Sequence, residues 1–170
     1  GGVAPGQSSG STLQYDSPAY LAVAQLAATS GKPLLNGKAD QVYNGSNGWG
    51  HAGYRANGTW TVNYKGIVTG PYHSKMTTTG IYSTDEVGSS LTYPFDDLPP
   101  GEYTVTIGSH SWWAFNARTT AVILEYDGKS EQRDTFTLDN SQPNVVRSYN
   151  FIKEQPGSFT IRLRAVNIGQ

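Results

Sequence analysis

The stretch that decides the fold runs from Phe95 to Gly128 and reads FDDLPPGEYTVTIGSHSWWAFNARTTAVILEYDG. Within it, Glu102 to Ile107 alternates apolar and polar residues, which is typical of a β-strand with one buried face. The Pro-Pro-Gly run at 99–101 excludes a helix before this strand and indicates a tight turn. Thr119 to Tyr126 is apolar on both faces at its centre, as a central strand of a sandwich would be. The Asp-Gly pair at 127–128 predicts a second tight turn.

Further β-prone segments lie on both sides of this stretch, at Thr59–Tyr64, Gly80–Ser83, Ser90–Phe95, Thr135–Leu138, Val145–Ile152 and Ser158–Val166. Short strands at this spacing, with turn signals between them, predict an all-β fold, an antiparallel β-sandwich or jelly roll. Ser17 to Ala28 begins with Ser-Pro and is rich in alanine, so we expect one short helix there, with a strand as the alternative. The glycine-rich stretch from Asn44 to Asn57 predicts a loop.

Size and composition place the chain in a broad class. Residues 1–12 read as a flexible linker, and residues 13–170 are expected to form one domain. Only 15% of the residues are charged, 20 are glycine and none is cysteine, which favours an extracellular all-β protein, secreted or on the surface of a bacterium. The 12 basic and 13 acidic residues argue against nucleic acid as a partner. The longest apolar run, Tyr20 to Ala28, is too short to cross a membrane.

Two adjacent tryptophans, Trp112 and Trp113, interrupt the strand pattern. Neighbouring side chains of a strand face opposite ways, so at least one of the two is expected in a loop, where exposed aromatic surface often contacts a partner. If each link reverses the chain, the loop at 109–118 shares its end of the sandwich with 84–89, 139–144 and the C-terminal tail. The glycine-rich loop joins them if residues 65–78 contain no additional strand. The candidate binding residues are then Trp49, His51, Tyr54, His110, Trp112, Trp113 and Arg118.

Each candidate also has a purely structural interpretation. One tryptophan of the pair can close the end of the core, Trp49 can anchor its loop, and Arg118 can pair with an acidic neighbour. Trp60 belongs to a predicted strand and is assigned to the core. The three histidines match no zinc-binding spacing.

The segments LTYPFDDLPPGEYTVTIGSHSWW, VILEYDG and GSFTIRLRAV together resemble the galactose-binding-like β-sandwiches, over roughly residues 80 to 166. These domains serve as carbohydrate-binding modules attached to secreted bacterial glycoside hydrolases. The resemblance implies that sugar binds at loops on one end through aromatic stacking. It also implies a covalently linked catalytic domain, a monomer, no required cofactor and, in many members, a structural calcium ion.

The sequence gives little support for an enzymatic function. There is no G-x-S-x-G elbow, P-loop or dinucleotide fingerprint, and the acidic residues fall in predicted turns without an evident opposed pair. We therefore expect a non-catalytic module that recognises a carbohydrate through loop aromatics and targets an appended glycoside hydrolase. The alternative is a structural or adhesive spacer domain without sugar affinity, and a small glycan-active enzyme ranks third.

Overall fold

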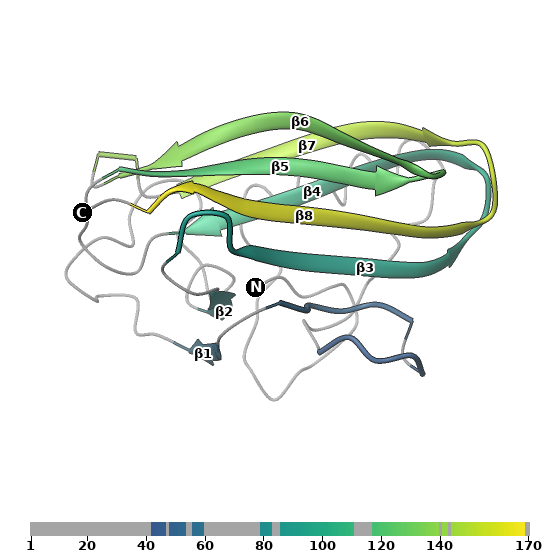
Figure 1. Cartoon of the computed structure of the whole chain (residues 1–170), viewed down its shortest axis with the longest axis horizontal. Coiled ribbons are helices and arrows are strands. Elements are labelled where there is room, and N and C mark those ends of the chain that lie inside the picture. The colour runs from purple at the N-terminus through teal and green to yellow at the C-terminus, as the bar shows by residue number, and fades with distance from the viewer. Residues whose placement is uncertain are drawn as a thin grey trace, which may run out of the picture.

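The computed structural model describes residues 42–46, 48–53, 56–59, 79–82, 86–110, 117–139, 141–142 and 144–168. All regular secondary structure in these segments is β (Figure 1). The strands are β1 (Ala56–Thr59), β2 (Thr79–Tyr82), β3 (Ser90–Leu98), β4 (Gly101–His110), β5 (Arg118–Tyr126), β6 (Lys129–Leu138), β7 (Asn144–Lys153) and β8 (Gly157–Asn167). In these segments no helix is long and apolar enough to span a membrane. The predicted linker at 1–12 and helix at 17–28 lie outside the described residues.

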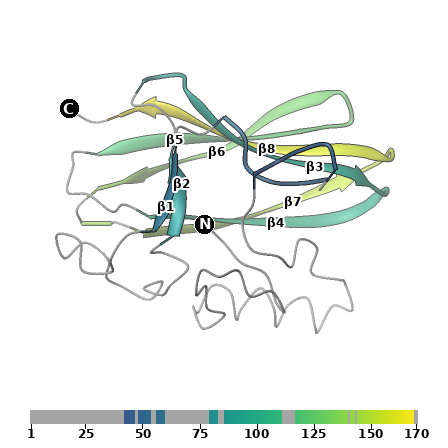
Figure 2. The same ribbon diagram turned by 90° about the horizontal axis from the view of Figure 1, so that it is seen from below.

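Two antiparallel sheets face each other and form a sandwich. The larger sheet has the strand order β3-β8-β5-β6, and the smaller one pairs β4 with β7. Figure 2 shows them as two layers, and β1 and β2 form a separate short ladder, which lies beyond β3 in Figure 1. The predicted all-β antiparallel sandwich is confirmed.

The hydrophobic core fills the space between the two layers. Val122 and Leu124 of β5 and Ile161 of β8 face it from the larger sheet, and Tyr149 and Phe151 of β7 face it from the smaller one; all are buried. In β4, alternation brings Tyr103, Val105 and Ile107 against this cluster, as the sequence predicted. Phe151 and Phe159 stack across the interface with ring centroids 4.2 Å apart, which ties the two sheets together.

Strand β5 is the central strand that its sequence predicts. It lies between β8 and β6, and Val122, Ile123 and Leu124 are 0%, 6% and 0% exposed. Val122 and Leu124 belong to the core, whereas Ile123, one residue out of phase, faces the opposite side of the sheet. Its burial therefore requires cover on that outer side.

The prediction that residues 44–57 are almost entirely loop is wrong in part. Segment 48–52 runs antiparallel along the outer edge of β3, with hydrogen bonds from Gly50 N to Pro94 O and between Ala52 and Thr92 in both directions. Strand β1 then begins at Ala56. The glycines allow close approach here: Gly53 has φ 68°, and a Cβ at this position would lie 2.7 Å from the carbonyl oxygen of Ser90.

Candidate functional site

One end of the sandwich collects the ends of six strands. Within the larger sheet, Ser90 lies opposite Arg164, Arg118 opposite Leu138 and Thr119 opposite Asn167; in the smaller sheet, His110 lies opposite Asn144. Residues 88–89 join this end through hydrogen bonds with Ala165. We call it the loop end; it lies at the left of Figure 1. The predicted convergence of the links after β4 and β6 with residues 86–89 and the C-terminal tail is confirmed for the backbone.

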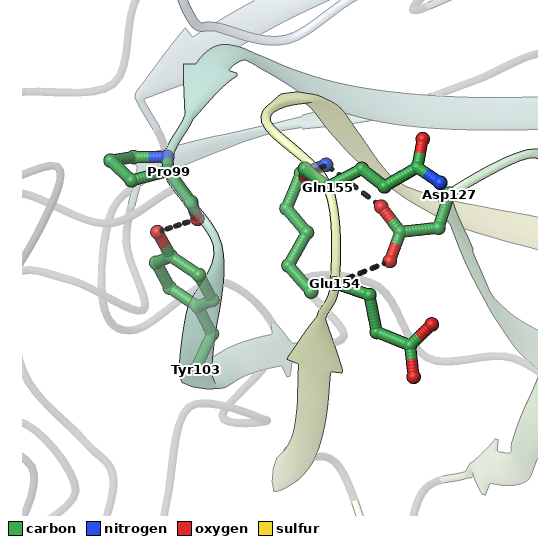
Figure 3. Close-up of polar contacts among 6 residues, drawn as sticks. Pro99, Tyr103, Asp127, Glu154 and Gln155 are labelled. Carbon is green, nitrogen blue, oxygen red and sulfur yellow. Dashed lines mark hydrogen bonds and ion pairs between the residues drawn. The ribbon is translucent and has the colours of Figure 1, made fainter.

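The opposite end, which we call the turn end, is closed by three short turns, at 97–101, 127–128 and 154–156. Asp127 (φ 50°) and Gly128 (φ 72°) form the tight turn between β5 and β6 that the Asp-Gly pair predicted. The Asp127 carboxylate accepts the backbone N–H of Glu154 at 2.7 Å and forms an ion pair of 3.0 Å with Lys153 (Figure 3). Lys153 is 2% exposed and also donates to the carbonyl oxygen of Gln155 at 2.7 Å.

These contacts set the ionisation of Asp127. The N–H of Glu154, and to a lesser extent the ammonium group of Lys153, hold the pKa of this carboxyl below its ordinary value. The buried ammonium and the charged carboxylate thus join the β5–β6 turn to the β7–β8 turn.

The third turn is fixed by a tyrosine. The Tyr103 hydroxyl donates a 2.6 Å hydrogen bond to the carbonyl oxygen of Pro99, which spans the Pro-Pro-Gly corner (Figure 3). The contact explains why a tyrosine follows this turn in the L-P-P-G-E-Y segment. At the turn end, the polar atoms described above make hydrogen bonds and an ion pair that stabilise the three turns.

Arg118 and His110 bracket the tryptophan pair. Arg118 is the first residue of β5, half-buried, and has the same alternation phase as Thr120 and Val122, which places it on the side facing the core. His110 is the last residue of β4. Trp112, Trp113 and Tyr54 lie outside the described residues, as does the side chain of His110.

Trp49 and His51 lie elsewhere, along β3. The Trp49 ring stacks on Phe95 with centroids 6.1 Å apart and an interplanar angle of 8°, and His51 is 2% exposed with its edge towards the Tyr93 ring. The structure therefore brings Trp49 and His51 together, on the β3 edge, and places Arg118 and the backbone of His110 at the loop end. A binding role for the seven candidates stays a prediction.

Two features beside these candidates were not singled out from the sequence. The Tyr43 hydroxyl donates to Asp96 at 2.9 Å near Trp49, which raises the pKa of Tyr43. Asp139, after β6, accepts hydrogen bonds from the hydroxyl and N–H of Ser141 and from the N–H of Gln142, and these bonds lower its pKa. The D-N-S-Q-P run at 139–143 was the available signal, because Asp and Ser commonly close such turns.

Across the segments that the structure describes, no group of three or more His, Asp or Glu side chains is arranged to hold a metal ion. Calcium also takes backbone and amide oxygens as ligands, so the structural calcium ion that the family resemblance implies stays a prediction.

No protein-family model and no curated protein matches this chain. Among solved structures, it is similar to a family 35 carbohydrate-binding module from an environmental isolate, with 19% identity over 69% of this chain and 78% of that one and a TM-score of 0.38. A family 35 module from Cellvibrio japonicus Abf62 gives 19% identity, 69% and 79% coverage and a TM-score of 0.40. A family 115 4-O-methyl-α-glucuronidase gives 12% identity, 81% and 18% coverage and a TM-score of 0.39. At these scores, none of them assigns a ligand or a residue role to this chain.

Proposed function

We propose that this domain is a non-catalytic carbohydrate-binding module whose glycan site lies at the loop end. One observation carries the proposal: the link that holds Trp112 and Trp113 leaves β4 at His110 and enters β5 at Arg118. Both attachment points lie at the end where the other strand links also converge.

The chemistry available at this end suits a sugar. A pyranose presents a face of C–H groups, on which an indole can stack, and an edge of hydroxyls that both donate and accept hydrogen bonds. The loop end carries a guanidinium group at Arg118 and an amide at Asn167, and the link from His110 to Arg118 contains both tryptophans in its sequence. Guanidinium groups donate paired hydrogen bonds, and side-chain amides both donate and accept hydrogen bonds.

One carboxylate at this end, Asp139, is unsuited to the role of a general acid. A glycosidase needs one carboxylic acid with a raised pKa, facing a second carboxylate across the bond to be cleaved. Asp139, a carboxylate at the loop end, has a lowered pKa, because Ser141 and Gln142 donate hydrogen bonds to its charged form. A lowered pKa is typical of a carboxylate that closes a turn, whereas a general acid needs a raised pKa.

In this proposal, the module is a monomer that holds a covalently linked glycoside hydrolase near its polysaccharide, in a protein secreted by a bacterium or displayed on its surface. Binding is modest, because a shallow site recovers little free energy beyond the cost of ordering the ligand. A spacer domain with the same fold would bind no glycan.

A glycan array followed by isothermal titration calorimetry tests the proposal. We expect the wild-type domain to bind at least one glycan, and Trp112→Ala or Trp113→Ala to weaken that binding at least roughly ten-fold with the fold intact. Trp49→Ala is the comparison variant, because its ring is stacked on Phe95 at the β3 edge. Binding that survives both loop-end substitutions but not Trp49→Ala would move the site to β3. A domain that binds no glycan would support the spacer.

A further inference from the structure

The four-stranded sheet has an outer face, turned away from β4 and β7, that is almost entirely polar. We define the outer face by the side chains that point away from the core. The strand register places them in four rows across the sheet: Pro94-Thr160-Glu125-Ser130, Thr92-Arg162-Ile123-Gln132, Ser90-Arg164-Ala121-Thr135 and Asn167-Thr119-Thr137. Alternation assigns these residues to the side opposite the core, and no aromatic ring is among them. The only charged groups in the rows are Arg162, Arg164 and Glu125.

One arginine, Arg164, reaches across this face. Arg164 of β8 donates from Nη2 to Oε1 of Gln132 on β6 at 3.4 Å, and β5 separates these two strands. The contact therefore has to pass over β5, and it covers Ala121 and Ile123, which are 0% and 6% exposed. The aliphatic stem of an arginine readily covers apolar surface while its charged head stays in water.

The charges of the face are not balanced. Arg162 is held by Glu125 through two bonds, from Nε at 2.7 Å and from Nη2 at 3.3 Å, so this pair is neutral overall. Arg164 is exposed, and its partner is the uncharged amide of Gln132. Two arginines against one glutamate leave a net charge of +1 on the outer face, on a chain whose formal net charge is −1. The excess positive charge is located at Arg164.

We propose that the outer face binds an anionic polysaccharide, with a sulfate or carboxylate group of the chain at Arg164. The proposal deepens the function proposed for the loop end, and it rests on that function only in taking the ligand to be a glycan. Guanidinium groups recognise both anions through paired, charge-assisted hydrogen bonds. The row of Arg164 adds the hydroxyls of Ser90 and Thr135, which suit the neutral hydroxyls of the same chain.

The charges of the face also give a prediction of sign. Removing the positive charge at Arg164 should weaken binding of an anionic glycan, and removing the negative charge at Glu125 should strengthen it. Neither change touches the tryptophans of the loop end.

The test is titration of the whole chain with dextran sulfate, with polygalacturonate and with neutral dextran, at low and at high salt. We expect one or both polyanions to bind, neutral dextran not to bind at this face, and the affinity to fall as salt rises. Arg164→Gln should weaken the binding roughly 3- to 10-fold, and Glu125→Gln should strengthen it two-fold or more. Lys129→Gln, which removes one positive charge at the β5–β6 turn, is the matched control and should have little effect.

The outcomes separate this inference from the proposed function. Polyanion binding that persists in Trp112→Ala and Trp113→Ala, and is lost in Arg164→Gln, supports an independent site even if no neutral glycan binds at the loop end. Equal losses in Arg164→Gln and Lys129→Gln would show unspecific attraction and overturn the inference, as would no binding of either polyanion at low salt. The two polyanions distinguish sulfate from carboxylate as the preferred group. Thermal unfolding of each variant verifies that the fold is intact.

Discussion

The two ends of this sandwich differ in how they join the strands. The turn end joins its strands through short turns fixed by a buried ion pair and a tyrosine hydrogen bond, whereas the loop end joins them through longer links that hold the tryptophan pair and polar side chains. Part of the aromatic core also lies towards the turn end: Tyr126 and Phe95 flank Phe159 in one row of the sheet, and Phe159 stacks on Phe151. We therefore expect substitutions at the turn end to cost more stability than substitutions at the loop end.

The largest expected effect is at the aromatic stack. Phe151→Ala should lower the free energy of unfolding by about 3–5 kcal/mol, because it removes a buried ring that contacts Phe159 and Tyr103 from opposite sides of the core. Phe136→Ala is the matched change towards the loop end, because this ring is equally buried and lies opposite Thr120, and it should cost less than Phe151→Ala. Urea denaturation followed by tryptophan fluorescence measures both. Equal losses would contradict a core weighted towards the turn end.

The next largest effect is expected at the buried ion pair. Lys153→Met replaces the side chain by a slightly shorter one without charge and should lower the free energy of unfolding, because the Asp127 carboxylate loses its cation. Chemical denaturation at neutral pH measures the loss. A variant as stable as the wild type would show that this pair contributes no net stability.

The same pair makes a prediction for pH. The pKa of Asp127 is lower in the folded protein than in the unfolded chain, so its contribution to stability is complete above the ordinary aspartate pKa and is lost as the pH falls through the lowered folded value. Lys153→Met removes one of the causes of the lowered pKa and should therefore make this acid-dependent loss smaller. An unchanged stability profile between neutral pH and about pH 3 in the variant would contradict the assignment.

Much of the sandwich could be predicted because its strands carry strong local signals. Alternation in Glu102–Ile107 and the Asp127-Gly128 turn both have the predicted structure, since period-two burial and positive-φ turns depend on few residues. Which strands pair was not predicted, because the order β3-β8-β5-β6 and the pair β4-β7 join strands that are far apart in the sequence. Segment 48–52 was missed because glycines that allow a close backbone approach look the same in sequence as glycines of a loop.

The candidate site could be predicted only in part. The sequence placed His110 and Arg118 at one end correctly, because strand ends follow from topology. It did not separate Trp49 from them, because contact with Phe95 depends on pairing across 46 residues, which no local pattern encodes. The outer face was also missed, since alternate polar residues on a sheet look like an ordinary solvated surface until the strand pairing brings Arg164 within reach of Gln132 across β5.

A smaller effect is expected at the corner closed by Tyr103. Tyr103→Phe removes only the hydroxyl that donates to Pro99 O and should cost about 1 kcal/mol, the usual net value of one hydrogen bond, while the ring stays stacked on Phe151. Thermal unfolding should show a small decrease in Tm. A loss as large as that of Phe151→Ala would mean that the corner itself, and not the stack, organises the turn end.

The smallest effect is expected at Asp139, which closes a turn at the loop end as Asp127 does at the turn end. Both carboxylates accept backbone N–H groups and both have lowered pKa values, but Asp139 has hydroxyl and amide donors where Asp127 has a buried ammonium. Asp139→Asn keeps an acceptor oxygen for Ser141 and Gln142, so the free energy of unfolding should hardly change. Amide hydrogen exchange at Ser141 and Gln142 should quicken, because a neutral acceptor holds these N–H groups less tightly than a carboxylate does. A global loss of stability comparable to that of Lys153→Met would show that the loop end supports the fold as strongly as the turn end, and the division between the two ends would fail.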